Sequence, residues 1–190
     1  MSWFHTEVCN QLEAVFKTDW KKVTGTDEER LLYGDFMKSE GTEYEVMPDM
    51  NAIIERMTGA LEDYNAISKT PMDLVLFPFA AEHVCRIMRV IKQPYGNVLS
   101  VGVGGSGRQS LTRLACHMAD YALFQIELTK SYDMTAWRDD LRLVLRQAGE
   151  KNQPTVFLFT DTQVKTEAMV EERRAMLEPA PSCDLLVISP

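Results

Sequence analysis

The chain has 190 residues, 45% of them hydrophobic and 25% charged, with a net charge of −8. These proportions are typical of a globular protein and exclude a disordered tail, a collagen-like chain and a disulfide-stapled miniprotein. The acidic balance argues against sequence-independent nucleic-acid binding, because contacts to many phosphates need a basic face, whereas binding one nucleotide needs only a local cradle.

No segment predicts secretion, a membrane span or a metal centre. The N-terminus lacks a basic region followed by an apolar run, and the most apolar stretch, residues 72–81, is short and interrupted by Pro78. The 4 cysteines and 3 histidines do not have zinc-ligand spacing. We therefore expect reduced thiols in a cytoplasmic protein without a membrane partner.

In the first half of the chain, apolar residues at helical spacing predict helices over residues 4–17, 49–65 and 79–92. Residues 21–45 are polar and predict a loop or short helices. The expected turn points in that loop are Gly25, Gly34 and Gly41.

The second half of the chain alternates short apolar runs with amphipathic segments. The expected order is strand 97–101, helix 108–119, strand 123–127, helix 136–148, strand 155–160 and helix 165–178. This alternation predicts an α/β fold with a parallel sheet and right-handed crossovers. Ligands of such a sheet bind at the carboxyl ends of the strands.

A glycine-rich loop, residues 102–107, lies between the first of these strands and its helix, where backbone N–H groups and a helix N-terminus can hold an anion. Two phosphate motifs fit it. GxGxxG predicts a dinucleotide site, with Glu127 at the end of the next strand as the ribose-binding acid. GxxxxGK[ST] predicts a P-loop, although Arg108 and Gln109 replace its Lys and Ser/Thr, and Ser110 follows one position late.

Asp161 favours the P-loop interpretation. It ends the buried apolar run 155–160, as does the aspartate that holds Mg²⁺ in P-loop NTPases. Arg108 can still bind phosphate oxygens, but Gln109 has no hydroxyl for the metal, and Thr162 stands where a catalytic glutamate is expected. The residues therefore predict nucleotide binding with weak or absent hydrolysis and no catalytic residue, so enzymatic activity stays open.

Several blocks, in order, resemble the fourth AAA+ module of axonemal dynein heavy chains, over about residues 32–169. The blocks are 33–37, 74–77, 82–87, 102–114, 124–128, 137–141 and 155–163. The resemblance implies three parts: the end of a preceding module over 1–45, a P-loop AAA+ core over 46–169 and a divergent tail over 170–190. It also implies that the chain is a fragment of a longer protein.

The resemblance implies ATP or ADP with Mg²⁺ as cofactors, Leu76 within the adenine-lining segment 74–77, and Asp161 facing Mg²⁺ through water. The expected nucleotide-binding residues are Gly102, Val103, Gly104, Gly105, Ser106, Gly107, Arg108, Gln109, Ser110 and Leu76. It further implies a regulatory module of a microtubule-based motor in the axoneme of cilia and flagella. The implied partners are other dynein modules and the dynein intermediate and light chains, with microtubules reached only through the full-length heavy chain.

Two alternatives stay open. The chain could be a structural or interaction fragment that binds no nucleotide, or a Rossmann oxidoreductase that uses Glu127. In the absence of a preceding module, the apolar stripe of residues 4–17 is expected to be partly exposed.

Overall fold

The computed structural model describes residues 2–25, 32–38, 43–94, 96–176 and 185–189, with the backbone alone for Ser2, 173–176 and 185–189. The chain divides into two compact units, Met1–Arg56 and Met57–Pro190. The boundary falls inside α3 (Met50–Ile67). The proposed module boundary at residues 45 and 46 stays a prediction.

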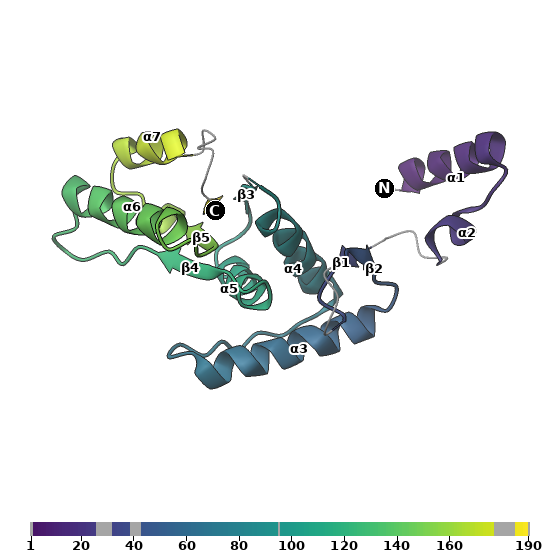
Figure 1. Ribbon diagram of the computed structural model, residues 1–190, viewed down its shortest axis with the longest axis horizontal. Helices are drawn as coiled ribbons and strands as arrows, with labels where there is room; N and C mark the ends of the chain where they lie inside the picture. The colour runs from purple at the N-terminus through teal and green to yellow at the C-terminus, as the bar shows by residue number, and fades with distance from the viewer. Residues whose placement is uncertain (1, 26–31, 39–42, 95, 177–184, 190) are drawn as a thin grey trace. The chain divides into compact units, whose positions relative to one another are not determined.

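The first unit contains helices and a small antiparallel sheet (Figure 1). Its elements are α1 (Ser2–Phe16), α2 (Trp20–Thr24), β1 (Tyr33–Gly34) and β2 (Glu45–Val46). The Asp19 carboxylate caps α2 by accepting a hydrogen bond from Lys22 N at 2.7 Å, and Gly25 ends it in the left-handed conformation. The prediction of short helices over 21–45 is confirmed by α2, but the sheet was missed because strands of two residues carry no periodic pattern. Gly41 lies outside the described residues.

The apolar residues of α1 are largely accessible, as expected. Phe4, Val15 and Phe16 have exposed fractions of 68%, 63% and 71%.

The second unit is built on a four-stranded parallel sheet with the order β3-β6-β5-β4 (Figure 1). Its strands are β3 (Val98–Leu99), β4 (Ala122–Gln125), β5 (Thr155–Leu158) and β6 (Leu185–Ser189). Its helices, besides α3, are α4 (Pro78–Ile91), α5 (Arg108–Met118), α6 (Met134–Gly149), the 3-10 turn η1 (Asp161–Gln163) and α7 (Glu167–Met176). The predicted α/β organisation with parallel strands is confirmed.

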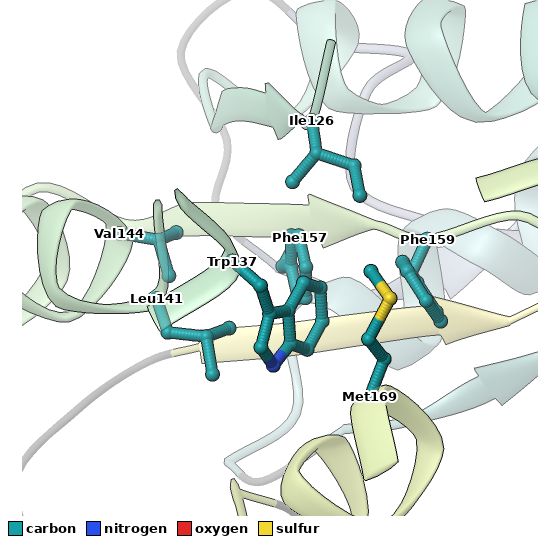
Figure 2. Close-up of a cluster of buried hydrophobic side chains, with 7 residues drawn as sticks. All are labelled: Ile126, Trp137, Leu141, Val144, Phe157, Phe159 and Met169. Atoms are coloured by element: carbon teal, nitrogen blue, oxygen red, sulfur yellow. The ribbon is translucent and has the colours of Figure 1, made fainter. Parts of the chain in front are cut away.

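Both faces of β5 are covered. Figure 2 shows the cluster on one face, where Trp137 of α6 and Met169 of α7 surround Phe157 and Phe159. Successive strand residues point to opposite faces, so Val156 and Leu158 lie on the other face, and both are buried as well. A strand buried on both faces is typical of a parallel sheet enclosed by helices.

Glu172 of α7 forms hydrogen bonds with side chains of α6. Its carboxylate accepts hydrogen bonds from Trp137 Nε1 at 3.0 Å and from Arg138 Nη2 at 2.7 Å. The hydrogen bond from the Arg138 guanidinium lowers the pKa of Glu172. The sequence alone suggests pairing within a solvated helix face, but the partners of Glu172 come from another helix.

Strand β6 was not anticipated. It pairs with β3 through Val98 and Ile188 and with β5 through Leu158 and Ile188. A five-residue apolar run is ambiguous without its neighbours, so this strand could not be assigned by periodicity. It joins the strand before the glycine loop to the strand before Asp161.

The described thiols form no disulfide with one another. Cys85 and Cys116 are buried, and Cys9 is half-buried. Burial raises the pKa of Cys85 to about 11 and that of Cys116 to about 12. Cys183 lies outside the described residues. The described part of the chain contains no cluster of three or more His, Cys, Asp or Glu fit to hold a metal, and none of its helices could span a membrane.

Candidate functional site

The glycine-rich loop connects β3 to α5. Gly105 and Gly107 have φ angles of 78° and 76°, a region that side chains rarely tolerate. The turn is closed by a hydrogen bond of 3.2 Å from Ser106 N to Val103 O. Gly107 is the N-cap of α5 and has no side chain with which to cap the first N–H groups of the helix. The loop thus combines left-handed glycines with an open helix N-terminus, which are the two features of an anion-binding turn.

Arg108, at the position of the P-loop lysine, is folded back along this loop. Its Nη1 donates to Ser100 O at 3.0 Å, and its Nη2 lies 3.5 Å from Val103 O. Its side chain passes close to Gly102, where an added Cβ would lie 3.5 Å from Arg108 Cδ and 3.4 Å from Ser106 Oγ. The guanidinium is therefore bonded to the loop itself.

A cavity of about 310 Å³ lies beside the loop and extends to Asp161. Its lining residues are Ser100, Gly105, Ser106, Gly107, Arg108, Gln109, Ser110, Thr112, Leu158, Thr160 and Asp161. The structure thus brings together seven of the predicted site residues, from Gly105 through Ser110 plus Asp161. Of this lining, Arg108 is the one cation and Asp161 the one carboxylate.

A second, mainly apolar cavity of about 710 Å³ shares Ser100, Ser106 and Arg108 with the first. Its other lining residues are Leu74, Val75, Phe77, Phe79, Ala80, His83, Arg86, Ile87, Val90, Val98, Leu99, Val101, Gly102 and Leu111. Most of these were not predicted as site residues. The apolar stripe of α4 is the signal that could have found them, but such a stripe is equally typical of a helix packed on a core.

Of the remaining predicted residues, Gly102 lines the apolar cavity and three line neither cavity. Leu74, Val75 and Phe77 of the expected adenine segment line the apolar cavity, whereas Leu76 is half-buried and outside that lining. Val103 and Gly104 line neither cavity.

Asp161 is positioned by a short turn after β5. It is exposed and begins η1, and its Oδ1 accepts a hydrogen bond from Thr162 N at 2.8 Å. The buried Gln163 holds this turn in place. Its Oε1 accepts from Thr160 N at 2.9 Å, and its Nε2 donates to Ile126 O at 2.7 Å. Gln163 therefore ties the chain after β4 to the chain after β5, a role that the sequence did not reveal.

No general base reaches the phosphate-side cavity from the position of the catalytic glutamate. Thr162 stands there, its Oγ1 lies 3.0 Å from Thr160 Oγ1, and it is not among the residues that line the cavity. Glu127, the acid required by the dinucleotide interpretation, is exposed after β4 and lines neither cavity. The geometry of the described residues thus favours the P-loop interpretation of the glycine loop.

Comparison with known proteins agrees with this site. The family model of the P-loop containing dynein motor region D4 matches residues 72–185, which extends past Met169, where the resemblance seen in the sequence ended. Human dynein axonemal heavy chain 1 is 50% identical over 144 residues, 75% of this chain and 3% of its own length. The flagellar inner arm I1 dynein-1-beta heavy chain of Chlamydomonas reinhardtii is 52% identical over 130 residues, 68% of this chain and 3% of its own.

Mouse dynein axonemal heavy chain 3 is 44% identical over 158 residues, 82% of this chain and 4% of its own. The chain thus spans only 3% to 4% of the length of these relatives. The expected class, an incomplete P-loop α/β fold, is confirmed. The chain belongs to the family of the P-loop containing dynein motor region D4, and its relatives are axonemal dynein heavy chains.

Proposed function

We propose that this chain is an ATP-binding regulatory part of an axonemal dynein heavy chain, equivalent to its fourth AAA+ module, with weak or absent hydrolysis. The observation that carries this proposal is the pair of adjoining cavities. A cavity of about 310 Å³, lined by the glycine loop and one arginine, adjoins an apolar cavity, and the two share Ser100, Ser106 and Arg108. A nucleotide has the same division into a charged and an apolar part.

The phosphates are assigned to residues 102–110 and the adenine to the apolar cavity. Left-handed Gly105 and Gly107 let the backbone approach a phosphate closely, and the α5 N-terminus favours negative charge. Leu74, Val75 and Phe77 supply apolar surface for the base, with Leu76 in the same segment. An added Cβ on Gly107 would lie 3.7 Å from Leu74 Cδ1, so the base-side segment and the phosphate loop are neighbours.

Mg²⁺ is assigned to Asp161, through water. Its carboxylate lines the same cavity as the loop, and carboxylate oxygens suit this hard cation. A bound Mg²⁺ would neutralise phosphate charge. Gln109 offers an amide oxygen where other P-loops have a hydroxyl, so we expect weaker metal binding than in an ordinary P-loop.

Weak hydrolysis follows from Thr162, because a hydroxyl cannot act as the base that activates water. Titration with a fluorescent ATP analogue, with and without Mg²⁺, tests binding, and phosphate release tests turnover. We expect saturable ATP binding and little phosphate release. Brisk release that Asp161→Ala abolishes would refute the low-activity part of the proposal.

Matched glycine variants locate the site. Gly105→Ala places a side chain at a left-handed position, which costs roughly 1–2 kcal/mol. We expect the free variant to leave this conformation and to recover it on binding, which lowers affinity by up to about tenfold. Gly59→Ala lies in α3, where an added Cβ meets nothing within 4 Å, and is expected to leave affinity unchanged.

Binding of an NAD analogue in place of ATP would favour the Rossmann alternative. No nucleotide binding would favour the structural fragment.

The cellular context is also a proposal and comes from the relatives, which are named as axonemal or flagellar dyneins. We place the chain in the axoneme as part of the cytoskeleton and of a motor that drives ciliary movement. Its partners there would be other dynein modules and the intermediate and light chains. Contact with microtubules would come only through the full-length heavy chain.

A further inference from the structure

We propose that Arg108 is a positioning residue that braces the glycine loop before nucleotide arrives, and that its bonds to the loop contribute more to affinity than its charge does. The effect on affinity rests on the proposed nucleotide site. The brace itself is a property of the nucleotide-free chain and can be measured without any ligand.

The brace spans two points of the backbone. Nη1 bonds Ser100 O at the end of β3, and Nη2 reaches Val103 O in the turn, at 3.0 and 3.5 Å. A guanidinium presents separate donors in a rigid planar fork, whereas a lysine presents one nitrogen on a flexible stem. Lysine at this position would keep the charge but could not reproduce both contacts with the same geometry.

The contacts converge on the turn that gives the loop its shape. Val103 O accepts the hydrogen bond from Ser106 N and also lies next to Arg108 Nη2. Gly102 leaves room for the arginine stem, since an added Cβ there would lie 3.5 Å from Arg108 Cδ. Loss of the guanidinium therefore removes support from the carbonyl that closes the turn, and the Ser106 amide becomes a reporter of the brace.

The two backbone contacts leave Arg108 with further hydrogen-bond donors. A guanidinium carries five N–H donors, so N–H groups remain after two backbone contacts. Arg108 also lines both the phosphate-side and the apolar cavity. The residue can therefore hold the loop and still present its charge to a bound anion.

The deciding experiment is amide hydrogen exchange of the nucleotide-free chain by NMR, read at Ser106 and its loop neighbours, in the wild type, Arg108→Lys and Arg108→Ala. Arg142→Lys and Arg142→Ala are the matched controls, because Arg142 is an exposed arginine of α6 that pairs with Asp139. We expect loop exchange to rise about tenfold in both Arg108 variants, the scale of a lost hydrogen bond from a charged donor. The Arg142 variants should match the wild type.

ATP-analogue affinity is then measured on the same proteins. A brace predicts similar losses, about tenfold, in Arg108→Lys and Arg108→Ala. If Arg108 served only as a counter-charge for phosphate, Arg108→Lys would retain affinity, Arg108→Ala would lose it, and the loop amides of both variants would exchange at the wild-type rate. This pattern of results overturns the proposal.

Two further outcomes stay informative. If the wild type binds no nucleotide, the proposed function fails, while the exchange comparison still decides the brace. If Arg108→Ala does not fold, ¹⁵N spectra of the wild-type arginine side chains decide instead. Resolved, slowly rotating Nη signals for Arg108 support the brace, and a freely rotating guanidinium like that of an exposed arginine overturns it.

Discussion

Replacement of Gln163 should be among the most damaging polar substitutions in the second unit. The Gln163 side chain is buried, with an exposed fraction of 6%, and satisfies one backbone donor and one backbone acceptor on different strand ends. Gln163→Ala removes both partners and leaves Thr160 N–H and Ile126 C=O buried without them.

The magnitude follows from these two groups. A buried polar group that loses its partner costs about 1–3 kcal/mol, and water entering the space left by the side chain recovers part of that cost. We therefore expect Gln163→Ala to lower the free energy of unfolding by about 2–4 kcal/mol. Gln153→Ala is the matched control, because Gln153 is exposed just before β5, and it should cost no more than about 0.5 kcal/mol.

Gln163→Glu separates the two bonds. A carboxylate can still accept from Thr160 N–H, but it cannot donate to Ile126 O and is repelled by that oxygen. The folded-state pKa of this glutamate should be raised, so its penalty is present at neutral pH and is relieved as the pH falls through that pKa.

Urea unfolding followed by the emission of Trp137, which is fully buried in the second unit, supplies the measurement, with circular dichroism as a second probe. The reasoning is refuted if Gln163→Ala costs no more than Gln153→Ala. It is also refuted if the deficit of Gln163→Glu is independent of pH between 7 and 4.

Two further predictions concern other contacts. Because Arg138 lowers the pKa of Glu172, the stabilisation of the fold by this ion pair is present above the unfolded-state pKa and is lost as the pH falls through the folded-state pKa. Below about pH 5, the stability of the wild type should therefore fall more steeply than that of Glu172→Gln. Parallel acid-denaturation curves for the two proteins would contradict this. Gly96→Ala places a Cβ 2.0 Å from Val90 O and should lower the free energy of unfolding by at least about 2 kcal/mol. Gly59→Ala lies in open space within α3 and should raise the free energy of unfolding by about 0.5–1 kcal/mol. Equal urea midpoints for the two variants would refute this contrast.

The helices were the most predictable part of the fold, because their apolar stripes are local. The helix predicted over 79–92 is Pro78–Ile91, and the one predicted over 108–119 is Arg108–Met118. The helix predicted over 136–148 begins earlier, at Met134, because Asp133 caps it by accepting from Thr135 N and Ala136 N. A cap residue carries no apolar periodicity, so the stripe alone places the start of this helix too late.

Within the candidate site, motifs located the residues but not their contacts. The glycine pattern and the strand-end aspartate are local features, so 102–110 and Asp161 could be proposed from the sequence. Gln163 could not, because its partner Ile126 O is 37 residues away in the chain. The same holds for Arg108, whose residue type suggests a phosphate ligand and whose contacts with Ser100 O and Val103 O appear only in the folded loop.

Strand β6, which has no recognisable motif, connects the two strands that bear the site. In the described sheet, β3 pairs with β6 and has no direct pairing with β5. The glycine loop follows β3 and Asp161 follows β5, so the backbone hydrogen bonds of Leu185–Ser189 place the two halves at the same edge of the sheet. Parallel strands need only an apolar run of the right length, so this segment can perform its role without any recognisable motif. The glycine loop and Asp161 line the same cavity, and β6 sets the spacing of the two strands that carry them.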